Sequence, residues 1–157
     1  MSYQAVILTV SDSCAAGTRT DTSGPAIRGM LENAGFVVQA MQTVPDEEGQ
    51  ISAAIVHACD ILQADLVVTT GGTGLSPRDV TPEATLAVLD REIRAIPVAM
   101  WVEGLKSTPR AMLSRAVAGI RGHTLVLNVP GSEKAARENL GAVVATLDHA
   151  LRMLAGG

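Results

Sequence analysis

Apolar residues along the chain form short continuous runs that are separated by polar or glycine-rich segments. Residues 5–10, 66–70 and 124–129 are runs of β-branched and aliphatic side chains, which is typical of strands buried on both faces of a sheet. Residues 36–44 predict one more strand. The strand at residues 5–10 is expected to be a central one, because it is apolar throughout and opens directly into a polar loop.

Between these runs, apolar residues recur at helical spacing. Prolines, glycines and acidic residues mark where the helices start and stop, and Thr81-Pro82-Glu83 combines an N-cap hydroxyl, an early proline and a carboxylate. The first predicted helix covers residues 26–34, and the second follows Pro45, reaches Leu62 and includes Cys59. A third begins at Thr81. Two more, at residues 98–106 and 110–116, follow Pro97 and Pro109, and the last covers residues 133–154.

Alternation of strands with helices predicts an α/β fold: a three-layer α/β/α sandwich with a mostly parallel sheet. Residues 118–121 could pair antiparallel with residues 124–129 through a tight turn at Gly122 and His123, which adds an antiparallel edge hairpin. The chain has 157 residues, 47% of them hydrophobic, and no internal repeat or linker. One domain over residues 1–157 is therefore expected.

Composition narrows the classes of partner. The chain has one Tyr, one Phe and one Trp, and its pI is about 5.3, so it offers neither stacking platforms nor an overall basic surface, and nucleic acid is not expected as a partner. No run of about 18 apolar residues and no basic leader occurs, so a cytoplasmic protein without membrane contact is expected. Cys14 and Cys59 lack metal-site spacing and are interpreted as two reduced thiols.

Polar, glycine-rich loops follow three of the predicted parallel strands, at residues 11–23, 71–79 and 128–132. In open α/β sheets ligands bind beyond the carboxyl ends of the strands. The sequence therefore predicts a site where these three loops converge.

The loop after the third strand begins with Gly71, Gly72, Thr73 and Gly74. Glycines allow close approach of the backbone to a ligand, so their N–H groups could cradle a phosphate. The loop is not a Walker motif, and Pro77 stands where a G-x-G-x-x-G pattern needs its last glycine. A sharp strand-to-helix turn without any ligand is the alternative interpretation.

Arg78 and Asp79 adjoin this loop and could hold one phosphate directly and a second through a divalent cation. A simple surface ion pair is the alternative for these two residues. Asp46, after the second strand, could face the same cleft or cap the following helix. Two aspartates without a His or Cys cluster favour Mg²⁺. Cations on the helical segments, Lys106 and Arg110, are also compatible with a solvated helix face.

The whole pattern resembles the molybdopterin adenylyltransferase family, the MogA/MoaB group that includes the G domain of gephyrin. The resemblance is carried by AVILTVSDSCAAGTRTDTSGP, VPDEE, TTGGTGLSPRDVTPEAT, AMLSRAVAGIRG and LNVPGS, in this order. It implies a three-layer α/β fold, usually a homotrimer, that uses Mg²⁺ and ATP to adenylylate molybdopterin with release of pyrophosphate. A transient contact with the molybdenum-inserting enzyme is also implied.

The resemblance implies roles for individual residues. Asp46 and Asp79 would be the catalytic, magnesium-associated residues, and Ser114 would contact the pterin with Arg115 nearby. The complete set of implied or predicted substrate-binding residues is Ser11, Asp12, Ser23, Gly24, Gly71, Gly72, Thr73, Gly74, Ser76, Arg78, Ser114, Arg115, Pro130, Gly131 and Ser132. Many relatives have P-G-x-P after the last strand, whereas here Glu133 follows Pro130-Gly131-Ser132. A carboxylate near a bound anion is unfavourable unless it points outward.

This chemistry agrees with the residue inventory. A phosphate monoester is largely dianionic at neutral pH, so its attack on the α-phosphorus of ATP needs no general base, and positioning with charge neutralisation suffices. A non-catalytic molybdopterin-binding or scaffold protein on the same fold is the second hypothesis, and a dinucleotide-dependent enzyme is the third. The pair of aspartates disfavours the second hypothesis, and the missing G-x-G-x-x-G disfavours the third.

Overall fold

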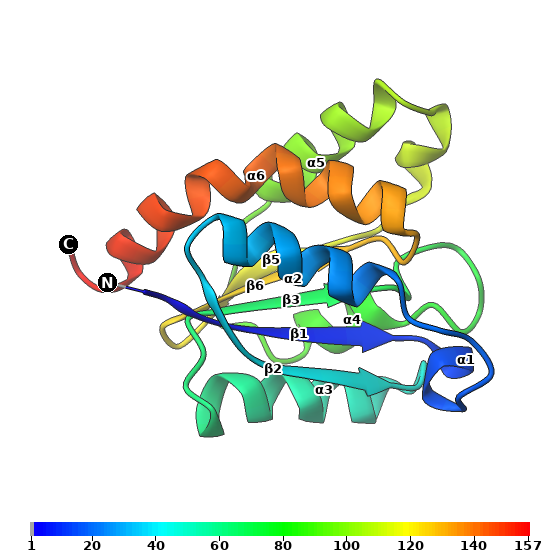
Figure 1. The fold of residues 1–157 in the computed structure, drawn as a ribbon, viewed down its shortest axis with the longest axis horizontal. Coiled ribbons are helices and arrows are strands. Elements are labelled where there is room, and N and C mark those ends of the chain that lie inside the picture. The colour runs from blue at the N-terminus through cyan, green and yellow to red at the C-terminus, as the bar shows by residue number, and fades with distance from the viewer. Residues whose placement is uncertain (1) are drawn as a thin grey trace.

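A computed structural model describes residues 2–157 of the chain (Figure 1). All six strands belong to one sheet. The strands are β1 (Gln4–Val10), β2 (Val37–Val44), β3 (Leu66–Thr70), β4 (Arg91–Glu92), β5 (Ala118–Arg121) and β6 (Thr124–Val129). The α-helices are α1 (Asp12–Ala15), α2 (Ser23–Asn33), α3 (Glu48–Val56), α4 (Thr81–Leu86), α5 (Ala95–Leu105) and α6 (Glu133–Leu154), with a π-helical turn η1 (His57–Ile61) and a 3-10 turn η2 (Pro109–Leu113).

The strand order is β2-β1-β3-β6-β5-β4. β2, β1, β3 and β6 are parallel, and β5 pairs antiparallel with β6 and with β4. Because the chain moves from β1 outward to β2 and then returns past β1 to β3, the order reverses between β1 and β3. Such a switch point leaves a crevice at the carboxyl ends of the strands.

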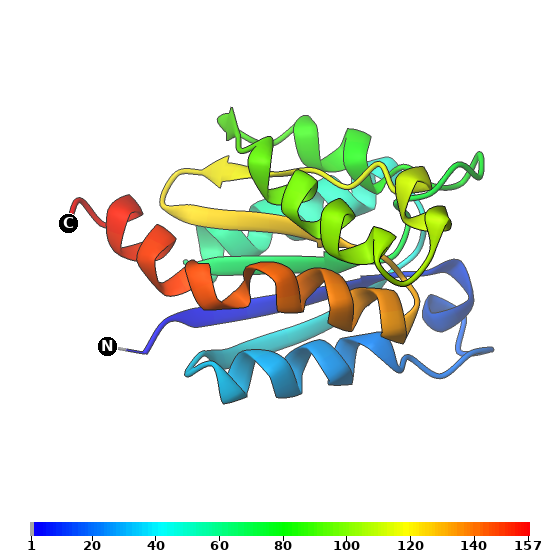
Figure 2. The same cartoon turned by 90° about the horizontal axis from the view of Figure 1, so that it is seen from above.

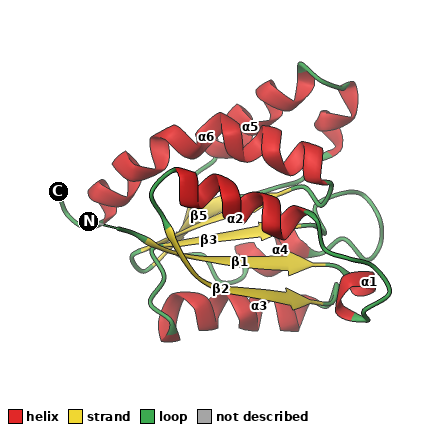
Figure 3. Ribbon diagram, in the orientation of Figure 1, coloured by secondary structure: helices red, strands yellow, loops and turns green. Residues whose placement is uncertain are grey.

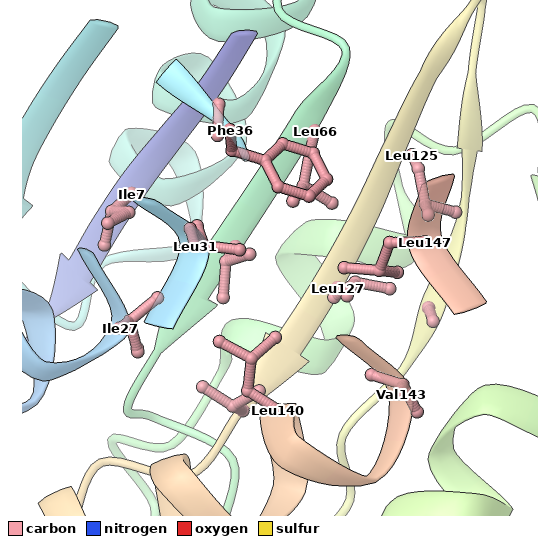
Figure 4. Packing of buried hydrophobic residues seen from close by; sticks show 14 of the residues in the cluster. Ile7, Ile27, Leu31, Phe36, Leu66, Leu125, Leu127, Leu140, Val143 and Leu147 are labelled. Carbon is pink, nitrogen blue, oxygen red and sulfur yellow. The ribbon is translucent and has the colours of Figure 1, made fainter. Parts of the chain in front are cut away.

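Helices cover both faces of the sheet, as Figures 2 and 3 show from two directions. On one face α2, α5 and α6 pack over a core that includes Ile27, Leu140 and Leu147, seen from close by in Figure 4. On the other face α3 and α4 pack over a second core with Ile51 and Ile55. The predicted α/β/α sandwich with a mostly parallel sheet is therefore confirmed, and β1 has neighbours on both sides.

The structure corrects the edge of the sheet. The predicted hairpin exists, with Gly122 at φ 60° in its turn, but it is not the outermost element, because β4 pairs with β5 beyond it. β4 consists only of Arg91 and Glu92, both exposed, and has no apolar alternation from which a strand could be predicted.

Several helix boundaries also differ from the prediction. The first loop contains the short helix α1, which Ser11 caps by accepting from the Cys14 N–H at 3.2 Å, and α2 begins three residues early, at Ser23. Pro97 lies in the first turn of α5, where its missing N–H leaves no hydrogen bond unmade. The predicted helix at residues 110–116 is only the turn η2. Residues 133–154 form α6 as predicted.

Cys59 belongs to the core, as expected. Its residue is 2% exposed, and burial raises the pKa of its thiol to about 11, so the thiol stays protonated at neutral pH. Within residues 2–157, none of the helices combines the length and the apolar character that a membrane span requires.

Candidate functional site

A cleft of about 780 Å³ lies at the carboxyl ends of β1, β3 and β6, where the predicted loops converge. The parallel strands point toward this end of the molecule, the end at which α1 lies (Figure 1). The cleft is bordered by predicted site residues from five separate segments. They are Ser11, Ser23, Asp46, Gly71, Gly72, Thr73, Gly74, Asp79, Ser114, Pro130, Gly131 and Ser132.

The glycine loop is a tight turn whose conformation requires glycine. Gly71 and Gly72 have φ values of 101° and 70°, and a Cβ on Gly71 would overlap the Val10 carbonyl oxygen. The Gly71 N–H donates to the Val129 carbonyl at 3.1 Å. The N–H groups of Gly72, Thr73 and Gly74 have no acceptor within residues 2–157, so the loop is a sharp turn that also leaves donors for an anion.

Thr81 has another role than the predicted one. The N-cap position of α4 is occupied by Val80, and the Thr81 hydroxyl instead donates to the Gly71 carbonyl at 2.9 Å. The Thr81 N–H donates to the Gly72 carbonyl at 3.1 Å. Thr81 therefore ties the glycine loop to the start of the helix that follows it.

Asp46 is held by Asp12 rather than by the helix that follows it. The Asp12 N–H donates to Asp46 Oδ2 and the Asp46 N–H donates to Asp12 Oδ1, both at 2.9 Å. Helix α3 has Glu47 at its N-cap position and no side-chain cap, so the alternative in which Asp46 caps it is wrong. Burial raises the pKa of Asp46, and the charges of Asp12 and Asp79 act in the same direction.

Asp79 reaches the same cleft from the loop between β3 and α4. Its Oδ2 accepts from the Ser76 N–H at 3.0 Å. Asp46 and Asp79 both border the cleft, and the charge of Asp79 acts with burial to raise the pKa of Asp46. The structure thus brings together the two aspartates that the sequence singled out.

Five predicted binding residues do not border the cleft: Asp12, Gly24, Ser76, Arg78 and Arg115. Arg78 donates from Nε and Nη2 to the two carboxylate oxygens of Asp12, both at 3.0 Å, and from Nη2 to Glu47 at 3.0 Å. Arg78 therefore belongs to an ion-pair network with Asp12 and Glu47, and it does not pair with its neighbour Asp79. The guanidinium lowers the pKa of Asp12.

Arg115 holds the loop that carries Asp79. Its Nε donates to the Gly74 carbonyl at 2.8 Å, its Nη2 to the Asp79 carbonyl at 2.7 Å, and its Nη1 to Glu83 at 2.6 Å. These contacts lower the pKa of Glu83. The predicted substrate contacts of Arg78 and Arg115 stay predictions, and their observed contacts are all within the protein.

The N-terminus of α2 is fixed by Asp21, a cleft residue that the sequence analysis did not single out. Asp21 accepts from the Gly24 N–H at 3.0 Å, from the Ser23 hydroxyl at 3.3 Å and from the Thr9 hydroxyl at 2.7 Å. A Cβ on Gly24 would overlap the Asp21 carboxylate, which explains glycine at that position. Asp21 lies one residue before the N-cap residue, Thr22, and the available signal was the D-x-S-G spacing of a carboxylate next to a helix start.

The Pro130-Gly131-Ser132 loop has a structural explanation. Ser132 caps α6 by accepting from the Ala135 N–H at 3.3 Å, and the Pro130 carbonyl accepts from the Thr70 hydroxyl at 2.7 Å. Glu133 does not border the cleft; it pairs with Arg137 one turn along α6, at 3.2 Å. The departure from P-G-x-P therefore places the carboxylate outward.

Cleft residues outside the predicted binding set include Arg19, Trp101, Lys134 and Arg110, the last of which was named only as a cation on a helical segment. The Trp101 Nε1–H is buried and has no hydrogen-bond partner within residues 2–157. A buried donor of this kind needs an acceptor from a ligand or from water. None of these residues belongs to a glycine-rich or acidic motif, so no local pattern in the sequence marks them.

The oxygen donors of the cleft suit Mg²⁺. Within the described residues no group of three or more His, Cys, Asp or Glu side chains could hold a metal by itself. Asp46 and Asp79 together offer two carboxylates, and each has an oxygen, Oδ1, that accepts no hydrogen bond from residues 2–157. This set fits a Mg²⁺ ion that takes its other ligands from water and substrate phosphates.

The chain is similar to several known proteins whose names agree with one another. Molybdopterin adenylyltransferase from Helicobacter pylori strain J99 is 38% identical over 96% of this chain and 86% of its own. Gephyrin from Dictyostelium discoideum is 42% identical over 94% of this chain. The matched region is only 22% of the length of gephyrin, so this chain spans about a fifth of that protein. The crystal structure of the molybdopterin biosynthesis enzyme MoaB from Thermus thermophilus has a TM-score of 0.93 and 49% identity, and the alignment covers 99% of this chain and 98% of that one.

A family model described as a probable molybdopterin binding domain matches residues 6–149. This range includes every strand of the sheet except the first two residues of β1, and all the loops that border the cleft. By this match and by its relatives, the chain belongs to the molybdopterin-binding domain family, in the MogA/MoaB group.

Proposed function

We propose that this chain is a molybdopterin adenylyltransferase, which transfers AMP from ATP to the terminal phosphate of molybdopterin and releases pyrophosphate. The observation that carries the proposal is the convergence of Asp46 and Asp79 in one cleft, beside the free N–H groups of the glycine loop. Pure binding of an anionic pterin would not need two carboxylates there, because they repel anions. The curated relatives named molybdopterin adenylyltransferase support the same activity.

The reaction follows from these residues. One oxygen of the molybdopterin phosphate forms a bond to the α-phosphorus of ATP, the bond from that phosphorus to the bridging oxygen breaks, and pyrophosphate leaves with the electron pair. The phosphate is already ionised, so no general base is needed. The N–H groups of Gly72, Thr73 and Gly74 bind phosphate oxygens, and Ser114 contacts the pterin. Asp46 and Asp79 would hold Mg²⁺, which would supply neutralisation of the triphosphate charge.

The test is direct. The purified chain is incubated with molybdopterin, ATP and Mg²⁺, and adenylylated molybdopterin and pyrophosphate are quantified. Both products are expected in equal amounts, and omission of Mg²⁺ should abolish them. If molybdopterin and ATP bind but neither product forms, the chain is instead a molybdopterin-binding scaffold, and the proposal is wrong.

We further propose that the chain assembles into a homotrimer, works in the cytoplasm and hands its product to a molybdenum-inserting enzyme. The assembly is supported by α5, on which Val98, Val102 and Leu105 share one face and are 49%, 57% and 45% exposed. Light scattering after size-exclusion chromatography should give three times the mass of the chain. Val102→Glu should lower that mass, and a monomeric wild-type protein would contradict the assembly.

A further inference from the structure

We propose that Arg78 is a positioning residue: acting through Asp12, it fixes the Asp46 carboxylate in the cleft and does not bind substrate phosphate. The inference rests on the proposed function, in which Asp46 helps to hold the metal. It assigns Arg78 a role other than the phosphate contact that its place beside Asp79 in the sequence had indicated.

The Asp12–Asp46 pair is the first step. Each residue donates its backbone N–H to the carboxylate of the other, at 2.9 Å in both directions. This reciprocal pair joins the end of β1 to the end of β2 and fixes Oδ2 of Asp46. The other oxygen, Oδ1, is left on the side of Gly72, where it would lie 3.1 Å from an added Cβ. The Asp12 backbone N–H thus holds Oδ2 of Asp46, and the Asp12 carboxylate holds the Asp46 backbone, so the position of Asp12 constrains where Oδ1 of Asp46 points.

Arg78 is the second step, because it determines the orientation of Asp12. Its Nε and Nη2 bind the two Asp12 oxygens in a bidentate pair at 3.0 Å, and Nη2 also reaches Glu47 at 3.0 Å. Arg78 belongs to the loop after β3, so its side chain links the loops that follow β1, β2 and β3. Planar bidentate pairing of this kind adds geometric specificity to an ion pair.

Two observations disfavour a role of Arg78 as a phosphate ligand. The residue does not border the cleft, and binding a phosphate would require it to give up charge-assisted hydrogen bonds to Asp12 and Glu47. Stability alone does not explain the network either. The side chains of Arg78, Asp12 and Glu47 are 54%, 45% and 51% exposed, and exposed ion pairs contribute little to folding. Positioning of Asp46 is what these contacts achieve.

The experiment compares Arg78→Ala and Arg78→Lys with a matched control, Arg121→Ala. Arg121 makes the same kind of bidentate pair, with Asp60 at 3.1 and 2.7 Å, away from the cleft. We expect Arg78→Ala to lower kcat about 10- to 100-fold, as is typical when a residue that orients a metal ligand is lost. KM for ATP should change less than about threefold. Arg78→Lys should recover kcat only in part, because an ammonium group cannot pair bidentately.

Binding supplies a readout that does not need turnover. Titration of Mn²⁺ in the presence of ATP, followed by electron paramagnetic resonance, should show about 10-fold weaker Mn²⁺ binding by Arg78→Ala. ATP binding without a metal, measured by calorimetry, should be unchanged. A rise of 10-fold or more in KM and in the metal-free dissociation constant for ATP would instead identify Arg78 as a phosphate ligand and overturn the proposal.

A double-mutant cycle tests the path through Asp12. If Arg78 acts on Asp46 by way of Asp12, then Asp12→Ala combined with Arg78→Ala should be no worse than Asp12→Ala alone. Additive losses would overturn the proposal, and so would an equal loss in Arg121→Ala. If the wild-type chain makes no adenylylated molybdopterin, the proposed function fails, but the Mn²⁺ titration still decides whether Arg78 positions Asp46.

Discussion

The two walls of the cleft are built differently. On the wall formed by the strand ends, both aspartates of the proposed metal site have defined partners: Asp46 is paired with Asp12, and Asp79 accepts from Ser76. On the opposite wall, formed by α5, η2 and the start of α6, the side chains of Arg110 and Lys134 have no ion-pair or hydrogen-bond partner within residues 2–157. Their positive ends extend into open solvent or into the cleft.

This difference indicates a division of labour. A phosphoryl-type transfer is accelerated by groups that are held in place before the reaction, because their reorganisation would otherwise add to the barrier. The strand-end wall satisfies this condition. Long unpaired side chains on the other wall lose conformational entropy when they bind, but they can follow the shape of a substrate. We therefore expect turnover to depend on the first wall and substrate affinity on the second.

The largest effect is expected on the fixed wall. Asp46→Asn or Asp79→Asn keeps the side-chain shape but removes the charge that would hold the metal, so kcat should fall by about 10³-fold or more, the scale of losing a charged group at a phosphoryl-transfer site. Adenylylated molybdopterin is measured against Asp148→Asn, a variant of an exposed carboxylate on α6. Activity within about tenfold of wild type in either active-site variant would contradict the assignment.

The backbone of the same wall gives the next largest effect. In Gly72→Ala the new methyl group would overlap the Thr81 hydroxyl and crowd Asp46 Oδ1, at a residue whose φ is 70°. Unfolding in urea should show a loss of more than the roughly 1–2 kcal/mol of left-handed strain alone, and kcat should fall. Gly122→Ala is the matched control: φ is 60°, nothing lies within 4 Å of its added Cβ, and activity should be unchanged.

The contrast between the walls also explains what could be predicted from the sequence. The strand-end wall is encoded locally, because apolar runs predict the strands and the polar residues directly after them must lie at one edge. Asp46, Asp79 and Gly72 were found in this way. The use of Thr81 as a tie to Gly71, and of Arg78 as a partner of Asp12, depends on side-chain contacts between distant loops, for which the sequence has no periodic signal.

Most residues of the opposite wall, formed by α5, η2 and the start of α6, could not be predicted from the sequence for a related reason. Residues 110–116 have helical spacing, but Pro109 and the extended Ser114 limit the segment to the turn η2. Trp101 is on a helix and has the spacing of a core residue. The structure is needed to show that it borders the cleft and that its buried N–H has no partner within residues 2–157. Strand β4 could not be predicted because it consists of two charged residues, which pair with β5 and have no apolar pattern of their own.

On this second wall a moderate effect is expected. Arg110→Ala and Lys134→Ala should each raise KM for the anionic substrates by about two- to fivefold, the scale of a solvent-exposed charge contact, with kcat unchanged. The increase should shrink as the salt concentration rises, because salt screens exposed charges. Arg91→Ala, which removes an exposed cation from β4, is the control. A fall in kcat without a rise in KM would show that this wall, too, takes part in the chemistry.

Trp101→Phe should have the smallest effect on the stability of the fold, and it gives the sharpest test of what this wall recognises. The substitution keeps an aromatic ring but removes a buried N–H that has no partner within residues 2–157. The free energy of unfolding should therefore stay the same or rise slightly, since an unpaired buried donor is itself costly. If a substrate accepts this N–H, its affinity should fall by roughly 0.5–1.5 kcal/mol, the net value of one hydrogen bond, as calorimetry with ATP and with molybdopterin can resolve. A loss for one substrate only would identify the part of the cleft that it occupies. Equal affinity of the variant for both would mean that water, and not a substrate, accepts the Trp101 N–H.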